Sequence, residues 1–495
     1  MASFLSRTIT LVLLSGIKTL AAPDQATTQA CADIQNALPG KVLTPSLLAL
    51  EYEHETQQYW STTLRTVDPA CIVQPSSAED VATVVKILNN YPTVKFATRS
   101  GGHDPNVGHA TAQDGVQIVM TDLAGATYDA EKDLAYVKPG GEWNDVISDL
   151  ESSGVAVVGG RLGLVGVGGY LLQGGISFLS AQEGLAADNI VGWETVLANG
   201  SIVNIDAAAH PDLAQAIRGS GSQFGIVTKF TIKPHHIGDV YGGFCVYDNS
   251  VEDSLYTALH DFTAKGAEDP KAAIIFSQLV AVGGLKTNLI YTFYDGPTPP
   301  TTGPFADLLN IPGIACLPRR RSYASLLRTN GEPTYTLPYI ASRPQMYKEI
   351  RDKLVEISEP FLTVLRATSQ FSLDFQPLPS LIGKISESKG GNAMGLSASD
   401  PDRLIIEIQG SWTLASDDAQ GYSVSKQLTD WLDEQVPEWL AEAGMSTQYL
   451  PLFMNDAAGD QDVTGSYKDV NKFRALQRSM DPNGLFSTRA GGYKY

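Results

Sequence analysis

The stretch Arg99-Ser100-Gly101-Gly102-His103-Asp104 begins one residue after the strand-like run 94–97. This junction organises the predicted fold. Two adjacent glycines let the backbone turn its N–H groups inward, at φ values that other residues avoid. The turn then forms a concave nest suited to a diphosphate. Arg99 would add positive charge to such a site, and His103 would stand at its edge. Because Ser-Gly-Gly turns are common, this stretch needs a second feature to support phosphate binding.

A second glycine cluster supplies that feature, with eight glycines between Gly159 and Gly175. The dinucleotide fingerprint of a Rossmann unit fails here, because its third glycine falls on Leu171, so we do not expect a nicotinamide site. So many glycines suit a backbone pressed along a large flat ligand. A third glycine-rich turn, 218–228, opens a strand and would close the same site.

Composition describes an ordinary globular protein. A chain of 495 residues predicts two or three lobes. Its 35 basic and 54 acidic residues give a net charge of −19, which argues against nucleic acid or an anionic membrane as a partner. We expect no metal site, because no Cys/His spacing suggests zinc.

The N-terminus is typical of a secretory signal, with a positive start to Arg7 and an apolar run from Ile9 to Leu20. Lys18 interrupts that run, so a buried N-terminal helix is the alternative. No other stretch is long and apolar enough to span a bilayer. Four cysteines fit a secreted protein, and they allow three pairings or four buried thiols.

Hydrophobic patterns predict an α+β protein. We expect a helix after Ser77 and two more at 144–153 and 211–217. In a second lobe we expect helices at 255–262, 344–354 and 423–434. The expected strands are 93–97, 116–120, 134–137, 192–197, 201–204, 225–232, 272–282, 289–293, 371–376 and 403–412.

The three glycine motifs occur in this order in one family. The chain resembles an FAD-linked oxidoreductase of the vanillyl-alcohol-oxidase superfamily, and specifically the berberine-bridge-enzyme-like branch of fungal type. This resemblance implies an α+β fold in which a two-lobed flavin-binding domain joins an antiparallel-sheet substrate domain. With the signal pattern of the N-terminus, the predicted parts are a signal peptide (1–21), an N-terminal helical segment (22–62), an FAD-binding domain (63–236), a substrate domain (237–448) and a C-terminal segment returning to the FAD domain (449–495).

The same resemblance implies FAD bound covalently through His103. Many members carry a second bond from a cysteine, but Leu162 stands at that position, so a single link is implied. Ile226 would add a backbone contact to the FAD. The implied FAD-binding residues are Arg99, Ser100, Gly101, Gly102, His103, Gly166, Gly168, Gly169, Gly174, Gly175, Val227 and Asn455. The resemblance also implies a Cys31–Cys71 disulfide.

On the substrate side, strand alternation places Ile405, Glu407, Gln409 and Ser411 on one face. The segment resembles the family strand that offers a glutamate or glutamine to the substrate, so Glu407 and Gln409 are the candidate catalytic residues. Buried above a flavin, Glu407 would have a raised pKa and would serve as base or acid. A solvated strand carboxylate is the equal alternative.

The sequence does not identify the residue that acts as the catalytic base. Many relatives have a Tyr-x-Asn-Tyr-x-Asp motif, and the matching run 453–458 keeps only Asn455. Asp374 and Tyr449 are the other candidates for the base. Among the histidines, His235 and His236 are expected to form a solvated linker pair. His109 is either close to the cofactor or turn filler.

The predicted activity is that of an oxidase that takes a hydride from a small organic substrate, a secondary metabolite, and reduces oxygen to hydrogen peroxide. Alternatives are a carbohydrate or oligosaccharide oxidase, and a flavin-bearing isomerase or cyclase without net oxidation. The expected partners are therefore a small-molecule substrate and oxygen.

Overall fold

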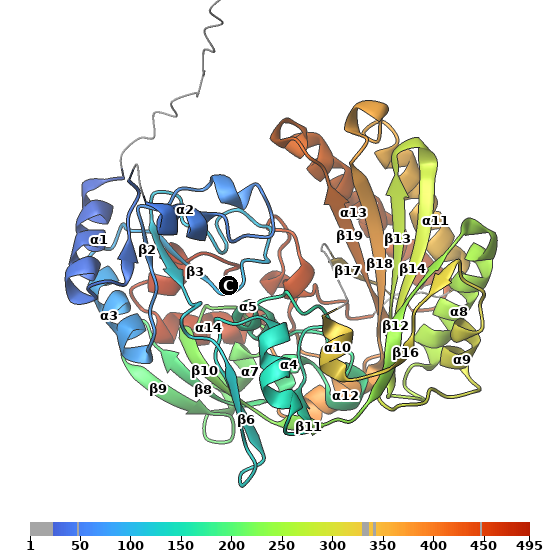
Figure 1. The fold of residues 1–495 in the computed structure, drawn as a ribbon, viewed down its shortest axis with the longest axis horizontal. Helices are drawn as coiled ribbons and strands as arrows, with labels where there is room; N and C mark the ends of the chain where they lie inside the picture. The colour runs from blue at the N-terminus through green and yellow to red at the C-terminus, as the bar shows by residue number, and fades with distance from the viewer. Residues whose placement is uncertain (1–22, 47–48, 329–335, 340–342, 446–447) are drawn as a thin grey trace, which may run out of the picture.

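A computed structural model describes residues 23–495 apart from 47–48, 329–335, 340–342 and 446–447. The expected signal segment, residues 1–21, lies outside the described residues. Two lobes face each other, with the blue and green chain on the left of Figure 1 and the yellow and orange sheet on the right. The fold is α+β, as predicted.

The N-terminal part of the left lobe is a small sheet covered by helices. Its strand order is β1-β2-β4-β3, with β2, β4 and β3 parallel. The helix expected after Ser77 is confirmed, because the Ser77 hydroxyl accepts a hydrogen bond from the Asp80 N–H at 3.2 Å and caps it. The elements are α1 (Gln25–Ala37), β1 (Val42–Leu43), α2 (Leu50–Thr56), β2 (Cys71–Val73), α3 (Ala78–Leu88), β3 (Phe96–Arg99) and β4 (Val116–Val119). A Cys31–Cys71 disulfide joins α1 to β2, so the implied pairing is confirmed.

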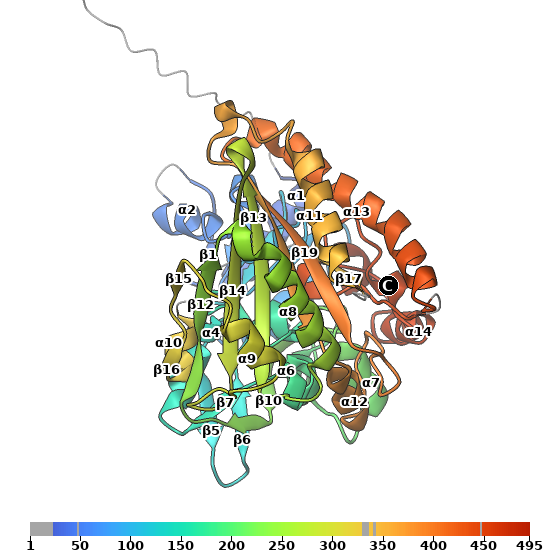
Figure 2. The ribbon, with the colours of Figure 1, turned by 90° about the vertical axis from the view of Figure 1, so that its right-hand side faces the viewer.

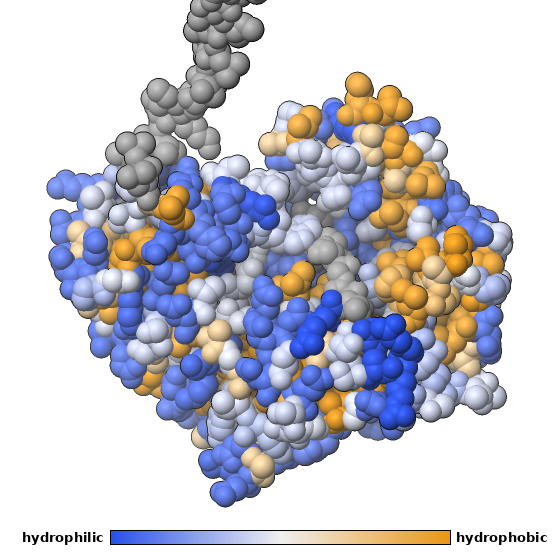
Figure 3. All heavy atoms as spheres, viewed as in Figure 1, coloured by the Kyte–Doolittle hydropathy of each residue, from blue (hydrophilic) through white to orange (hydrophobic). Residues whose placement is uncertain are grey.

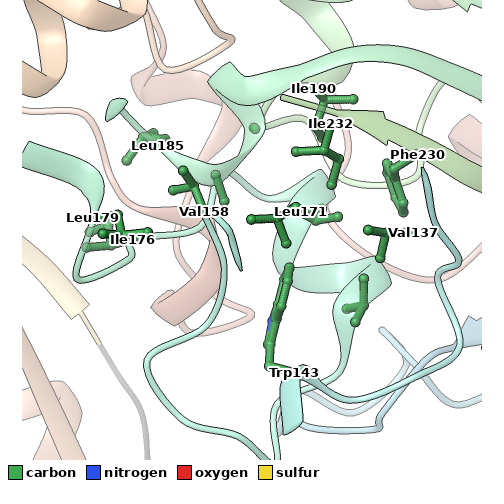
Figure 4. Packing of buried hydrophobic residues seen from close by; sticks show 14 of the residues in the cluster. Val137, Trp143, Val158, Leu171, Ile176, Leu179, Leu185, Ile190, Phe230 and Ile232 are labelled. Carbon is green, nitrogen blue, oxygen red and sulfur yellow. The ribbon is translucent and has the colours of Figure 1, made fainter. Parts of the chain in front are cut away.

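The second half of the left lobe is an antiparallel sheet in the order β5-β6-β10-β8-β9. Its strands are β5 (Ala126–Asp129), β6 (Leu134–Val137), β8 (Ile190–Val196), β9 (Ile202–Asp206) and β10 (Ile226–Ile232). The helices here are α4 (Trp143–Glu151), α5 (Val167–Leu172), α6 (Ser180–Glu183) and α7 (Pro211–Ile217). Fully buried Trp143 belongs to the core of this lobe and lies next to Leu171 (Figure 4).

The right lobe is an eight-stranded antiparallel sheet in the order β15-β12-β14-β13-β18-β19-β17, with β16 also pairing β12. Its strands are β12 (Val240–Tyr247), β13 (Ala272–Ala281), β14 (Leu285–Tyr294), β15 (Ala315–Cys316), β16 (Arg319–Arg321), β17 (Thr336–Tyr339), β18 (Gln370–Leu378) and β19 (Arg403–Ser411). A second disulfide, Cys245–Cys316, joins β12 to β15.

Helices cover only the outer face of this sheet. Figure 2 shows α8, α11 and α13 lying across it. These helices are α8 (Glu252–Lys265), α9 (Pro304–Leu309), α11 (Gln345–Ser358) and α13 (Asp418–Glu442), the last much longer than expected. The outer face carries apolar side chains such as Phe276, Phe375 and Ile406, which pack in one core with these helices. The inner face turns toward the left lobe.

Three connections join the lobes. In the first, β11 (Pro234–His236) pairs with β7 (Val155–Val157). In the second, α10 (Tyr323–Leu327) lies against α4 and α12 (Ser380–Ser388) lies against α6. In the third, the C-terminal segment returns to the left lobe through α14 (Val470–Met480), and Ala490 forms a bridge with Phe96. Within the described residues, no helix has the length and apolarity needed to cross a membrane.

Candidate active site

A cavity lies where the two lobes meet, and Figure 3 shows the surface hollowed between them. Its walls come from the turn after β3, the glycine-rich loop before α5, the start of β10, strand β19 and two pieces of the C-terminal segment. The space open to the centres of water molecules measures about 220 Å³. One water needs roughly 10–15 Å³ on this measure, so the cavity has room for a large extended ligand.

Two glycine loops form one wall of the cavity. A Cβ on Gly101 would lie 2.6 Å from the Gly166 Cα, so the two backbones touch at a distance that only glycine permits. The Ser100 hydroxyl donates to the Pro139 carbonyl and accepts from the Gly168 N–H at 3.1 Å, which fixes the two loops together. Gly169 lines the cavity with nothing within 4 Å of where its Cβ would be, so its backbone is open to a ligand.

The rest of this surface also fits a flat cofactor. Ile226 and Val227 begin β10, the middle strand of the sheet, and both apolar residues line the cavity. Gly102 has φ +70°, which bends the turn around the cavity. These residues therefore suit an FAD: glycine backbone faces the ligand, and apolar strand residues flank it.

Arg99 behaves differently from the expectation. Its guanidinium turns away from the cavity, forms an ion pair with Glu55 and donates to the Glu55 carbonyl at 2.6 Å. It also lies over the Tyr59 ring, at 5.0 Å from the centroid. The charge of Arg99 is therefore used inside the protein, and Arg99 is not among the described residues that line the cavity.

His103 lines the cavity, and its ring stacks on Trp60 with centroids 5.6 Å apart. Burial lowers the pKa of His103 to about 4, with Asp104 acting weakly in the opposite direction. The imidazole is therefore neutral at ordinary pH and has a lone pair available. His109 also lines the cavity, where its Nδ1 is 3.0 Å from an Asp104 carboxylate oxygen, so the turn-filler alternative is wrong.

Not all glycines of the second cluster face the cavity. A Cβ on Gly159 or Gly160 would lie within 2.5 Å of the Trp143 ring, so both glycines allow Trp143 to pack closely; Gly160 also lines the cavity, whereas Gly159 does not. Gly174 and Gly175 lie behind the cavity wall, where the Gly175 N–H donates to the Asn455 side chain at 2.9 Å. Asn455, which does line the cavity, also donates to the Tyr170 carbonyl at 3.1 Å, so it ties the C-terminal segment to α5.

The opposite wall is polar. Glu407 projects from the inner face of β19 and lines the cavity at 7% exposure, so the solvated alternative is wrong. Gln376, on the neighbouring strand β18, donates to Glu407 at 2.6 Å and accepts from Arg161. Asp456 and Arg161 line the same cavity.

Gln409 and Asp374 lie beside this wall on the inner face of the sheet, and Gln409 shares that face with Glu407, as strand alternation predicted. Neither is among the described residues that line the cavity. Gln409 bonds Asp374, which also accepts from Ser277 and Ser372. Burial raises the pKa of Asp374 to about 7. Gln409 therefore reaches the cavity only through its neighbours, in contrast to the direct substrate contact expected for it.

Two other candidates lie elsewhere. Tyr449 donates to the Met394 carbonyl at 2.5 Å and does not line the cavity. His235 is not a solvated linker residue, because its ring lies between Glu183 and Asp295 at 3.0 Å from each. Among the described residues, no group of three His, Cys, Asp or Glu side chains is placed to hold a metal ion.

Sequence reasoning missed Arg161, Gln376 and Asp456. Arg161 is the single charged residue within the glycine cluster, and Asp456 directly follows the motif residue Asn455, so both had a local signal. Gln376 had no local sequence signal apart from its position on one face of a predicted strand.

Comparison with known proteins agrees with this geometry. Residues 69–206 match the model of a family described as FAD binding domain. An FAD-linked oxidoreductase of Arthroderma benhamiae is 34% identical over 467 residues, covering 90% of this chain and 91% of the relative. An FAD-dependent monooxygenase of Aspergillus calidoustus is 30% identical, covering 95% of this chain and 91% of the relative. A solved variant of berberine bridge enzyme is 17% identical with a TM-score of 0.73, covering 93% of this chain and 98% of that one.

Proposed function

Because the chain belongs to the FAD-linked oxidoreductases and has the fold of berberine bridge enzyme, we propose that it oxidises a small organic substrate and passes the electrons to oxygen. The observation that carries this proposal is the cavity between the lobes. One wall is glycine backbone suited to a flavin, and the other holds Glu407 among hydrogen-bonded polar groups. A substrate between these walls would face both an electron acceptor and a proton acceptor.

Bound FAD would supply hydride acceptance and reoxidation by oxygen, with release of hydrogen peroxide. The residues proposed to hold it are Ser100 to Gly102, Gly166 to Gly169 and Val227. Asn455, which lines the cavity, would brace this wall through its hydrogen bonds to Gly175 and Tyr170. Glu407 would orient the substrate and exchange a proton with it, and Gln409 would act on that exchange through Asp374.

We propose a single covalent link through His103. Its imidazole is neutral, lines the cavity and is held in place by Trp60. Leu162 lines the same cavity where many relatives carry a cysteine, and its side chain has no nucleophilic atom.

Secretion is proposed on two observations. The N-terminal segment has the pattern of a signal, and two disulfides stabilise the described part of the chain. N-terminal sequencing of protein recovered from culture medium tests it, and a chain that still begins at Met1 would contradict it.

The experiment for the activity is an anaerobic screen in which substrates are mixed with the holoprotein and flavin absorbance is followed. Bleaching followed by recovery in air, with one peroxide released per turnover, supports an oxidase. The name of the Aspergillus relative favours a monooxygenase as the second candidate. In that case an ¹⁸O atom from labelled oxygen enters the product and the peroxide yield falls.

A further inference from the structure

Asp456 is the one carboxyl that the C-terminal segment brings to the cavity's polar wall. It ends the short turn 454–456, directly after Asn455. Because Asn455 is fixed by hydrogen bonds to Gly175 and Tyr170, the position of the next side chain is fixed as well. The Asp456 carboxyl lies in the protein interior with part of its surface open to the cavity.

Gln376 connects Asp456 to Glu407. Its amide nitrogen donates to Glu407 at 2.6 Å, and its side chain also bonds Asp456. Asp456 and Glu407 are therefore both neighbours of one side-chain amide, and both line the same cavity. The carbonyl end of Gln376 accepts from Arg161, so the amide cannot rotate without losing that bond.

The surrounding charges favour one shared proton. Burial raises the pKa of Asp456, while Arg161 and Gln376 act in the opposite direction. The groups around Asp456 come from four elements: Arg161 from the glycine loop, Tyr170 from α5, Gln376 from β18 and Glu407 from β19. Two carboxyls, one proton and one guanidinium sum to zero charge. Because a net-neutral wall neither attracts a cation nor repels an anion, it suits a neutral substrate.

Resting on the oxidation proposed above, we infer that Asp456 and Glu407 form a carboxyl pair that holds one proton, and that Asp456 accepts the hydroxyl proton of a neutral alcohol substrate. The O–H bond breaks and its proton moves to the Asp456 carboxylate. Its electron pair forms the second carbon–oxygen bond, while the hydrogen on that carbon leaves with its electrons to the flavin. Arg161 is the positioning residue that keeps Gln376 directed at both carboxyls.

Two measurements test the pair on the holoprotein, and the first needs no substrate. The control Asp374→Asn removes the other buried carboxyl of this face and serves as the background. In that background we expect an infrared C=O band of a protonated carboxyl that titrates between about pH 4 and 8. Adding Asp456→Asn should abolish it, and adding Glu407→Gln should shift its titration. A band unchanged by both substitutions would overturn the pair.

The second measurement is anaerobic flavin bleaching by benzyl alcohol, cyclohexanol and D-glucose as probes. Asp456→Asn should slow it 10²- to 10⁴-fold with flavin content unchanged. The double variant should be no slower than the worse single variant, because the two residues act as a unit. Asp456→Glu should restore part of the rate. Wild-type rates in Asp456→Asn, or single effects that multiply, would refute the inference. If no probe bleaches the wild-type flavin, alcohol oxidation fails, and the infrared titration still decides the pair.

Discussion

His235 is held between carboxylates of the two lobes, and its replacement tests whether this contact stabilises their junction. Its Nδ1 lies 3.0 Å from Glu183 of α6, and its Nε2 lies 3.0 Å from Asp295, which follows β14. Burial opposes a charge on the ring, but the hydrogen bonds that His235 donates to Asp295 and Glu183 outweigh it and raise the pKa of His235 to about 9. Lys389 also bonds Glu183, at 3.3 Å, so the cluster is a small charged network.

The raised pKa fixes the sign of the pH dependence. A histidine whose pKa is about 9 when folded and near 6.5 when unfolded contributes its full stability below pH 6.5. That contribution is lost as the pH rises through about 9. The difference corresponds to ~3 kcal/mol at 1.36 kcal/mol per pH unit. Because the site is partly open to solvent, screening reduces the expected value to about 1–2 kcal/mol.

Urea unfolding of the wild type and His235→Gln, followed by tryptophan fluorescence at pH 6, 8 and 10, measures this contribution. We expect the variant to be less stable by about 1–2 kcal/mol at pH 6 and the gap to close toward pH 10. His236→Gln is the matched control, because the side chain of His236, next to His235 in the sequence, is exposed and pairs with Asp133 at the surface. A gap that stays constant from pH 6 to 10 would refute the charged assignment.

Three further predictions concern the cofactor, the first disulfide and the neighbour of the polar wall. His103→Ala should leave FAD extractable by denaturant, whereas native protein precipitated by acid should keep it; flavin freed from the native protein would contradict the covalent link. Reducing the Cys31–Cys71 disulfide, which spans 40 residues, should cost about 4 kcal/mol in the free energy of unfolding, and an unchanged urea midpoint in the Cys31→Ser, Cys71→Ser variant would argue against it. Gln409→Ala should raise the pKa of Asp374, since it removes a donor to that carboxylate, and a carboxyl infrared titration that does not move would show that the two side chains act separately.

Local patterns predicted the parts of this structure that depend on local chemistry. The period of two in β19 placed Glu407 and Gln409 on one face, because successive strand side chains alternate whatever the strand packs against. The cap at Ser77 likewise depends only on its neighbours in sequence. The order of the lobes came from the family resemblance, because hydrophobic periodicity contains no information about it.

Features that depend on distant partners were not predictable in the same way. Arg99 is adjacent to the glycine turn, but Glu55 of α2 offers its guanidinium a charged partner on the other side of β3. Gly159 belongs to the glycine cluster that the sequence assigns to a ligand, but it packs against Trp143 and does not line the cavity. His235 read as a linker residue, because its two carboxylates come from positions more than 50 residues away on either side.

The polar wall follows from the same limit. Arg161, Gln376 and Asp456 belong to three segments whose separation in sequence hides their contact, and they meet only because the C-terminal segment returns across the cavity. At this place many relatives have tyrosines, and the chain has an aspartate within reach of an arginine and a second carboxyl. A phenol gives up its proton near pH 10, whereas a buried carboxyl balanced by a guanidinium exchanges its proton closer to neutrality. In the proposed mechanism, Asp456 therefore takes the place of a tyrosine as proton acceptor. The pH dependence of turnover should show whether a carboxyl or a phenol accepts the proton.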